Sequence, residues 1–287
     1  MSDFQTPSTI HVTAPFMASD VTSVELARLG FKTFNEKPNA VELTGTLDDC
    51  MRLNLQLRTA SRVLFMLDEF QAQDAEQLYE KVNAYEWEKW IDVNGYFSVQ
   101  SYTHNASINN TLFTNLKVKD AVADRFMQKF NKRPDSGPSK EGVIIFLHWV
   151  ESNVSLYLDT SGDSLARHGY RKIPLQAPLQ ENLAAAMVLS TNWERDTQHF
   201  VNPMCGSGTL AIEAALYKTR KPPGLIKKDH AFRYIKGYDD TQWEQLVIAA
   251  EDKVPTKPFG GRIIATDISR DAVNAAKINA KLAGVDH

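Results

Sequence analysis

The sequence predicts an α+β half, up to about residue 160, followed by an α/β half with a parallel sheet. In the first half, strand-like and helix-like segments alternate without a regular strand–helix–strand order, which is typical of α+β domains. In the second half, a strand leads into a glycine loop and a helix, and a later strand ends in an acid. That succession is typical of half of a nucleotide-binding sheet. Between the halves, residues 161–175 contain Gly162, Gly169 and Pro174, which favour a joint between two domains.

The composition is that of an ordinary globular protein. A chain of 287 residues has room for two domains. Its 43% hydrophobic and 23% charged residues exclude disordered and fibrous classes. With a net charge of −3, any nucleic-acid site must be a local basic patch. The start of the chain has no signal-peptide pattern, no apolar run is long enough to span a membrane, and there are only two cysteines. We therefore expect a cytoplasmic protein without a membrane partner or a disulfide framework.

The first half is expected to form six strands, at residues 10–15, 41–44, 62–70, 95–103, 143–150 and 154–159. The β-branched residues Ile10, Val12 and Thr13 favour the first of them. A helix is expected to begin at Asp20, as its N-cap, and to stop at Gly30. Further helices are expected at residues 47–60, 76–85 and 118–130, with a loop at 133–142. We expect this half to have its own core and to fold by itself.

The second half is expected to begin with a helix at residues 184–189, followed by a strand that ends at 200–201. A glycine loop at 205–209 opens the helix 210–217, and the strand 262–266 precedes the helix 272–283. Residues 218–261 form an insertion between these two strand–helix units. A dinucleotide fingerprint places its acid about 20 residues after the glycine loop, so this long spacing argues against a standard dehydrogenase.

The strongest chemical signal is the segment VNPMCGSGTLAIEAAL, residues 201–216. Gly206 and Gly208 would let the backbone approach a ligand closely, and the helix behind them offers its N-terminal N–H groups. The alternative is a tight strand-to-helix turn without a ligand. Asp267 follows the second strand, where a carboxylate would accept hydrogen bonds from both hydroxyls of an adenosine ribose. Its alternative role is the N-cap of the next helix.

Three groups of basic residues suggest RNA binding, because cations neutralise phosphates. One lies at the start of the insertion, from Lys218 to Lys236, and one in residues 117–140, which include Lys132 and Arg133. The third is the joint, with Arg167, His168, Arg171 and Lys172 around Tyr170, a ring that could stack on a base. For any single lysine, a solvated surface remains the common alternative.

No metal site is expected, because the seven histidines lack the spacing of metal ligands. Cys205 has neither a C-x-x-C partner nor a placeable histidine, so we interpret it as a small residue packed under the glycine loop. The aromatic cluster YEWEKW, residues 85–90, favours a core or rim position over a base-stacking platform.

The segment NPMCGSGT, residues 202–209, resembles the (D/N)-P-x-C-G-S-G-T loop of THUMP-containing RNA methyltransferases. The similarity is greatest to the large-subunit rRNA guanine-N2 methyltransferases, which have also been labelled N6-adenine-specific DNA methylases. Four further segments resemble that family and extend the similarity over essentially the whole chain: residues 52–64, 158–171, 177–193 and 266–285.

The resemblance implies a ferredoxin-like and THUMP region at residues 1–160, a linker at 161–175, and a class I, Rossmann-like methyltransferase domain from 176 to 287. It also implies S-adenosylmethionine as cofactor, structured RNA (most simply rRNA) as partner, and methylation of a guanine N2 amine. The cofactor-binding residues would be Asn202, Pro203, Cys205, Gly206, Ser207, Gly208, Thr209, Asp267 and Ile268. The RNA-binding residues would be Lys132, Arg133, Arg167, His168, Tyr170, Arg171 and Lys172.

Two departures from the family pattern bear on activity. Asn202 stands where most relatives have Asp, and the N-P-P-Y loop that grips the target amine does not occur in the sequence. We therefore expect a truncated domain whose catalytic residues are unknown, with weak or no cofactor binding, retained RNA binding and no turnover. Two other interpretations stay open: an RNA-binding module without activity, and an adenine-N6 DNA methyltransferase.

Overall fold

An eight-stranded sheet runs through the first 159 residues of the computed structural model, which describes residues 3–105, 108, 110–176, 178–227, 229–255 and 260–286. The strand order is β2-β3-β1-β4-β8-β7-β5-β6. Neighbours are antiparallel, except that β5 pairs in parallel with both β6 and β7. The strands are β1 Ser8–Thr13, β2 Thr33–Lys37, β3 Ala40–Gly45, β4 Arg62–Gln71, β5 Tyr96–His104, β6 Asp135–Ser136, β7 Val143–Val150 and β8 Asn153–Asp159.

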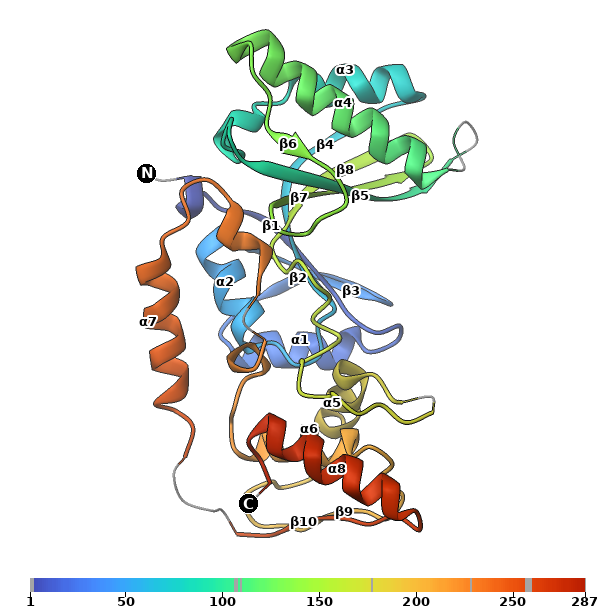
Figure 1. Ribbon diagram of the computed structural model, residues 1–287, viewed down its shortest axis with the longest axis vertical. Helices are drawn as coiled ribbons and strands as arrows, with labels where there is room; N and C mark the ends of the chain where they lie inside the picture. Colours follow the sequence, from blue (N-terminus) through green and yellow to red (C-terminus); the bar gives the residue numbers. More distant parts are fainter. Residues whose placement is uncertain are drawn as a thin grey trace.

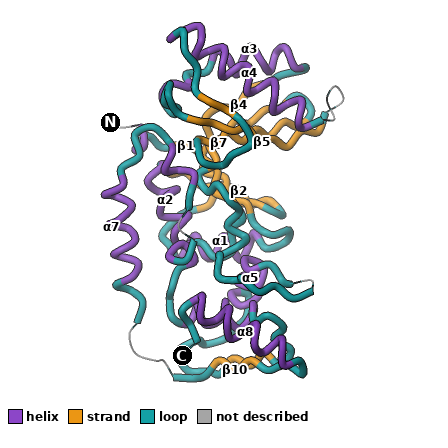
Figure 2. Tube along the Cα trace, in the orientation of Figure 1, coloured by secondary structure: helices purple, strands orange, loops and turns teal. Residues whose placement is uncertain are grey.

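Strand β4 joins two modules into this one sheet. Its first residues pair with β1, from Arg62 to Phe65, and its later residues pair with β8, from Leu64 to Gln71. A bulge between Met66 and Asp68 interrupts the pairing with β8 just beyond the stretch that pairs with β1, and bulges bend and twist a strand. The result is an elongated molecule with α3 and α4 at one end and β9 and β10 at the other (Figure 1). Figure 2 shows the large sheet in the upper and middle parts and β10 at the lower end.

Four helices accompany the sheet in the first half: α1 Ser19–Arg28, α2 Leu47–Gln56, α3 Ala75–Ala84 and α4 Thr111–Phe130. Helix α2 begins with a capping box between Thr46 and Asp49. It ends at Gln56 and not at residue 60, because Leu57 is already extended. Asp20 lies in the first turn of α1, whose N-cap is Ala18, so the predicted capping role of Asp20 is wrong. Gly30 follows α1 with a φ of +87°, as a helix stop should.

The second half contains two parallel strands, β9 Phe200–Asn202 and β10 Ile263–Ala265, with Asn202 opposite Ala265. Its helices are α5 Glu181–Leu189, α6 Thr209–Lys218, α7 Asp240–Glu251 and α8 Arg270–Ala283. The core beside α6 is small and centres on Tyr170, Ile212 and Leu216. Val201 and Ile264 of the two strands stay exposed, by 59% and 41%. None of the described helices is long and apolar enough to cross a bilayer.

The insertion between β9 and β10 packs against the first half. It carries two short 3-10 turns, η3 Pro223–Leu225 and η4 Ala231–Tyr234, followed by α7, while η1 Asp3–Gln5 and η2 Trp87–Lys89 lie in the first half. Helix α7 runs beside α2 (Figure 1). Phe232, Ile235, Trp243 and Ala250 belong to the same buried cluster as the cores of the first half. The core of the first half therefore extends into the insertion, and independent folding of the first half stays a prediction.

Candidate functional site

The glycine loop and the acid after β10 lie side by side at one edge of the small sheet. Because β9 and β10 are parallel, their carboxyl ends meet at this edge. The backbone ties the two loops together: Cys205 N–H donates to the Thr266 carbonyl at 2.9 Å, and Thr266 N–H donates to the Asn202 carbonyl at 3.0 Å.

The Asp267 carboxylate is held against the loop by two backbone donors. Ser269 N–H donates to Oδ1 at 3.0 Å, and Gly206 N–H donates to Oδ2 at 2.9 Å. These two hydrogen bonds lower the pKa of Asp267, so the carboxylate is charged at neutral pH. The alternative role of Asp267 as N-cap of α8 is not the observed one, because the side chain of Ser269 caps that helix. Asp267 is thus a fixed acceptor beside the loop.

The two glycines of the loop have different roles. At Gly206, with a φ of +54°, an added Cβ would meet no atom within 4 Å. At Gly208, with a φ of +86°, it would lie 2.8 Å from the Cβ of Ala276 on α8. Gly206 therefore borders open space, whereas the absence of a side chain at Gly208 lets α6 and α8 pack closely. Gly208 is also the N-cap of α6, and no side chain bonds its first turn, which leaves N–H groups for a ligand.

The other loop residues divide into buried and exposed ones. Those with side chains below the surface are Asn202, Cys205, Ser207 and Thr209, whereas Pro203 and Ile268 are exposed. Burial and the neighbouring Asp267 charge raise the pKa of the Cys205 thiol. The thiol therefore stays neutral at pH 7, as expected of a residue that packs under the loop.

Asn279 on α8 is a site residue that sequence reasoning missed. Its fully buried amide donates to the Ser207 and Ile173 carbonyls, each at 3.1 Å, and accepts from Lys172 N–H at 3.1 Å. It thereby fastens the joint to the glycine loop. The sequence could have indicated this burial, because Asn279 lies on the same helix face as Ala272, Ala275 and Ala283, the other buried residues of α8.

The joint itself is packed between the halves. His168 and Tyr170 are each 1% exposed, and both contact Oε1 of Glu213 on α6 at 2.8 Å. The other ring nitrogen of His168 lies 3.1 Å from the Arg58 carbonyl oxygen, and Arg171 pairs with Glu181 at 3.1 Å. The predicted stacking of Tyr170 on a base and the phosphate contact of His168 do not fit this burial. The side chains of His168, Tyr170 and Arg171 therefore act as internal ties.

The carboxylates that surround His168 favour the protonated form of its ring. Burial opposes the charge, but the carboxylates of Glu213 and Glu181 outweigh it and raise the pKa of His168. One ligand atom each of His168, Glu181 and Glu213 lies within 4.8 Å of the others, a grouping that the sequence spacing did not reveal. Both ring nitrogens of His168 already contact protein acceptors.

The predicted RNA-binding cations are only partly exposed. Lys132 and Arg133, after α4, and Arg167 and Lys172, before α5, have exposed side chains. Helices α4 and α5 lie in different parts of the elongated molecule (Figure 1), so these cations form two separate pairs and not one patch.

Most lysines at the start of the insertion are bonded to backbone carbonyls. Lys221 donates to Ala283 at the end of α8 at 2.9 Å, and Lys236 donates to Glu88 at 3.0 Å. Lys218 donates to Arg195 and Gly260, and Lys227 donates to Asp163. Lys228 lies outside the described residues. This basic group therefore fastens the insertion in place.

Three family models match the chain in succession. A model described as "RlmL ferredoxin-like domain" matches residues 9–64, "THUMP domain" matches 72–159, and "RMKL-like, methyltransferase domain" matches 168–287.

Curated relatives share this succession over part of their length. "Ribosomal RNA large subunit methyltransferase K/L" of Syntrophotalea carbinolica is 37% identical over 98% of this chain. The protein of the same description from Psychromonas ingrahamii is 34% identical over 91% of it. The chain spans 40% of the length of the first and 35% of the second.

Solved structures resemble the whole chain. A possible methylase from Clostridium difficile 630 has a TM-score of 0.88 and 26% identity, with 98% of this chain and 74% of that chain covered. A predicted N6-adenine-specific DNA methylase from Listeria monocytogenes str. 4b F2365 has a TM-score of 0.87 and 30% identity, with coverage of 98% and 73%. SMU.472, solved as a complex with SAH, has a TM-score of 0.86 and 27% identity, with coverage of 98% and 73%.

Proposed function

The chain belongs to the THUMP-domain-containing, S-adenosylmethionine-dependent methyltransferases, and from this premise we propose that it contributes to methylation of ribosomal RNA. The target would be the exocyclic N2 amine of a guanine. The observation that carries the proposal is the contact between Gly206 and Asp267, which sets a charged acceptor beside an open glycine backbone.

The residues at this edge fit the cofactor. Asp267 would accept hydrogen bonds from the ribose hydroxyls, since each carboxylate oxygen has further acceptor capacity beyond its one backbone bond. The open space at Gly206 would let the ligand lie against the backbone. The first turn of α6, which no side chain caps, would present its N–H groups to the polar groups of the cofactor.

When bound, S-adenosylmethionine supplies a methyl group on a positively charged sulfur. The guanine amine nitrogen would form a bond to the methyl carbon as the carbon–sulfur bond breaks, and the amine would then lose a proton. For such a displacement the protein mainly aligns nucleophile and leaving group. In this chain, Asp267 and the glycine loop would hold one of the two reactants, the cofactor.

The ferredoxin-like and THUMP modules would hold the RNA. The exposed cations Lys132, Arg133, Arg167 and Lys172 are available for phosphate contacts. Arg171 is tied to Glu181 and would act through the fold of the joint.

The sequence contains no N-P-P-Y motif, which the family uses to hold the target amine. We propose that these 287 residues bind RNA, bind the cofactor weakly and do not transfer a methyl group by themselves. The second candidate function is a non-catalytic RNA-binding module, which the lack of an N-P-P-Y motif in this sequence also favours. The name of the Listeria relative suggests adenine in DNA, but a THUMP-type half would have no role on duplex DNA.

Calorimetry separates these candidates. The chain is titrated with S-adenosylmethionine, an RNA hairpin and a DNA duplex of matched sequence. The proposal expects binding of RNA and weak binding of the cofactor. Binding of RNA without any cofactor would favour the RNA-binding module, and preference for DNA would contradict the proposal.

A further inference from the structure

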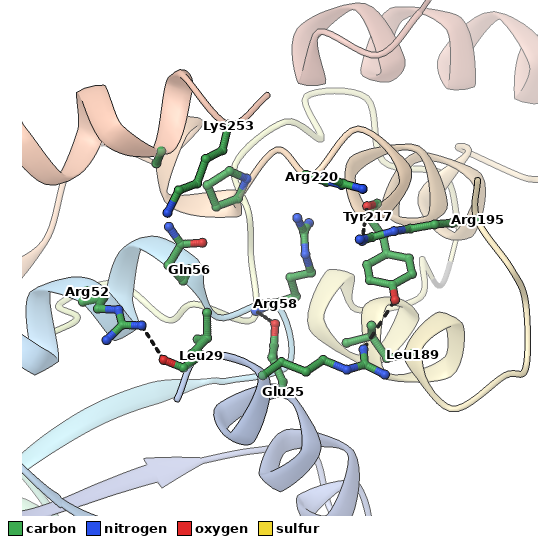
Figure 3. Close-up of a pocket in the computed structure, with 13 residues that line it drawn as sticks. Glu25, Leu29, Arg52, Gln56, Arg58, Leu189, Arg195, Tyr217, Arg220 and Lys253 are labelled. Atoms are coloured by element: carbon green, nitrogen blue, oxygen red, sulfur yellow. Dashed lines mark hydrogen bonds between the residues drawn. The ribbon is translucent and has the colours of Figure 1, made fainter. Parts of the chain in front are cut away.

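A pocket of about 640 Å³ lies between the two halves of the chain, away from the glycine loop. This size falls in the range of roughly 300–1,000 Å³ that small-molecule sites occupy. Helix α2 and the end of α7 line one side, the end of α6 and the loop before β9 line the other, and the end of α1 lies between them (Figure 3). Two parts of the chain that are far apart in sequence thus build it together.

The lining is strongly basic. Six of its side chains carry a positive charge: Arg28, Arg52, Arg58, Arg195, Arg220 and Lys253. The single carboxylate among the lining residues is Glu25. Its oxygens accept from the backbone N–H groups of Arg58 and Thr59, at 2.9 and 3.1 Å, and from the Thr59 hydroxyl at 2.8 Å. Glu25 therefore braces the chain behind the pocket.

Three of these arginines are positioned by neutral groups, so their charge is not cancelled. Arg195 donates to the Tyr217 carbonyl at 3.0 Å and lies 4.3 Å above the Tyr217 ring. Arg28 reaches the hydroxyl of the same tyrosine at 3.4 Å, and Arg52 donates to the Leu29 carbonyl. Figure 3 shows Arg195 and Tyr217 on one side of the pocket and Arg52 and Gln56 on the other. Arg220 pairs with Asp196 at 3.7 Å, but this ion pair is exposed and therefore weak.

Arg58 is a buried cation of the pocket with an unused hydrogen-bond donor. It is 8% exposed and donates through Nη2 to the Lys221 carbonyl at 2.8 Å, while its Nη1 has no partner among the described residues. Burial lowers the pKa of the guanidinium, although the carboxylates of Glu25 and Glu213 act in the opposite direction. A buried guanidinium with an unused donor is costly, and a bound anion would offset that cost.

We propose that this pocket binds phosphate groups of the substrate RNA, bridging the ferredoxin-like module and the methyltransferase domain. The inference rests on the proposed RNA binding. Arginine forks match phosphate oxygens bidentately, and five of the six cations are arginines. The cations come from five separate segments of the chain, a spread that suits several phosphates of one strand better than a single small anion. RNA bound here would hold α6, which begins at the cofactor loop, in a fixed relation to α1 and α2.

The test removes two exposed cations of the pocket, Arg28→Gln with Lys253→Gln, and compares them with Lys277→Gln plus Lys281→Gln on α8. Both double variants lose the same charge from exposed positions. Fluorescence anisotropy measures binding of a labelled RNA hairpin from 50 to 300 mM salt. We expect the pocket variant to bind roughly tenfold more weakly, with the salt slope reduced by about 1.5. The control should stay within about twofold of the wild type.

The results distinguish RNA binding at this pocket from RNA binding elsewhere on the chain. If the wild type binds RNA and the pocket variant binds equally well, or both variants lose the same affinity, the pocket is not the RNA contact. If the wild type does not bind RNA, the proposed RNA binding fails first. Calorimetry with inorganic pyrophosphate then tests the other source of phosphate: binding of pyrophosphate without RNA would identify a pocket for a free phosphate compound and overturn the inference.

Discussion

The amide nitrogen of Gly206 and Oδ2 of Asp267 are 2.9 Å apart, although 60 residues separate them in the chain. This hydrogen bond links the loop after β9 to the loop after β10. It fixes the orientation of the carboxylate that we propose as the acceptor for a ribose.

Replacing the Asp267 carboxylate should weaken cofactor binding with little effect on folding. Asp267→Asn keeps the shape of the side chain but loses the charge that strengthens hydrogen bonds to hydroxyls. We expect affinity for S-adenosylhomocysteine to fall roughly tenfold or more in calorimetry. Asp271→Asn, in the first turn of α8, is the matched control and should bind normally. Equal affinity of the two variants would remove Asp267 from the cofactor site.

The two glycines of the loop should respond differently to substitution. Gly208→Ala places a Cβ 2.8 Å from Ala276, so overpacking adds to the cost of a left-handed residue, together about 2–4 kcal/mol of unfolding free energy. Gly206→Ala meets no neighbour and should cost only about 1–2 kcal/mol, but it fills space that the ligand would use. Thermal unfolding and calorimetry measure the two effects. A Gly208 variant with unchanged stability would contradict the packing role.

His168 should make the joint less stable as the pH rises. Its pKa in the folded chain is raised, so its protonated form, paired with Glu213, contributes stability below about pH 6.5, the ordinary value. That contribution is lost as the pH rises through the higher folded pKa. The difference in unfolding free energy between the wild type and His168→Gln should therefore be greatest near pH 6 and shrink toward pH 9. Urea unfolding at several pH values measures it, and a pH-independent difference would show that folding does not raise the pKa of His168.

Trp243 should stabilise the first half of the chain from a distant place in the sequence. It is 5% exposed and packs against Phe232, with ring centroids 4.9 Å apart, inside the core shared with the sheet. Trp243→Ala should cost about 3–5 kcal/mol. Hydrogen exchange should then show faster opening of α2 and of the neighbouring strands, whereas the half-exposed Leu246→Ala should cost less. Unchanged exchange in α2 would show that the insertion does not support the first half.

Local patterns predicted much of this structure, because they report which residues favour a strand, a turn or a glycine conformation. Strand β7 has the predicted bounds, and the glycine loop and Asp267 meet as expected. Strand β2 was missed because its sequence, TFNEK, is polar and mostly exposed. The burial of His168 and Tyr170 was missed because their partner, Glu213, lies more than 40 residues away, and a buried cation looks like a surface one in sequence. The packing of the insertion depends on contacts of equally long range.

Methyl transfer to rRNA is the decisive measurement for the proposed function. Labelled S-adenosylmethionine and unmodified rRNA are incubated with the 287-residue chain and with a version extended by the remainder of a relative's methyltransferase domain, including the N-P-P-Y loop. We expect label at a guanine with the extended version, strongly reduced label when it carries Asp267→Asn, and no label with the 287-residue chain. Robust transfer by the short chain, or transfer by the extended version to DNA and not to RNA, would contradict the proposed function.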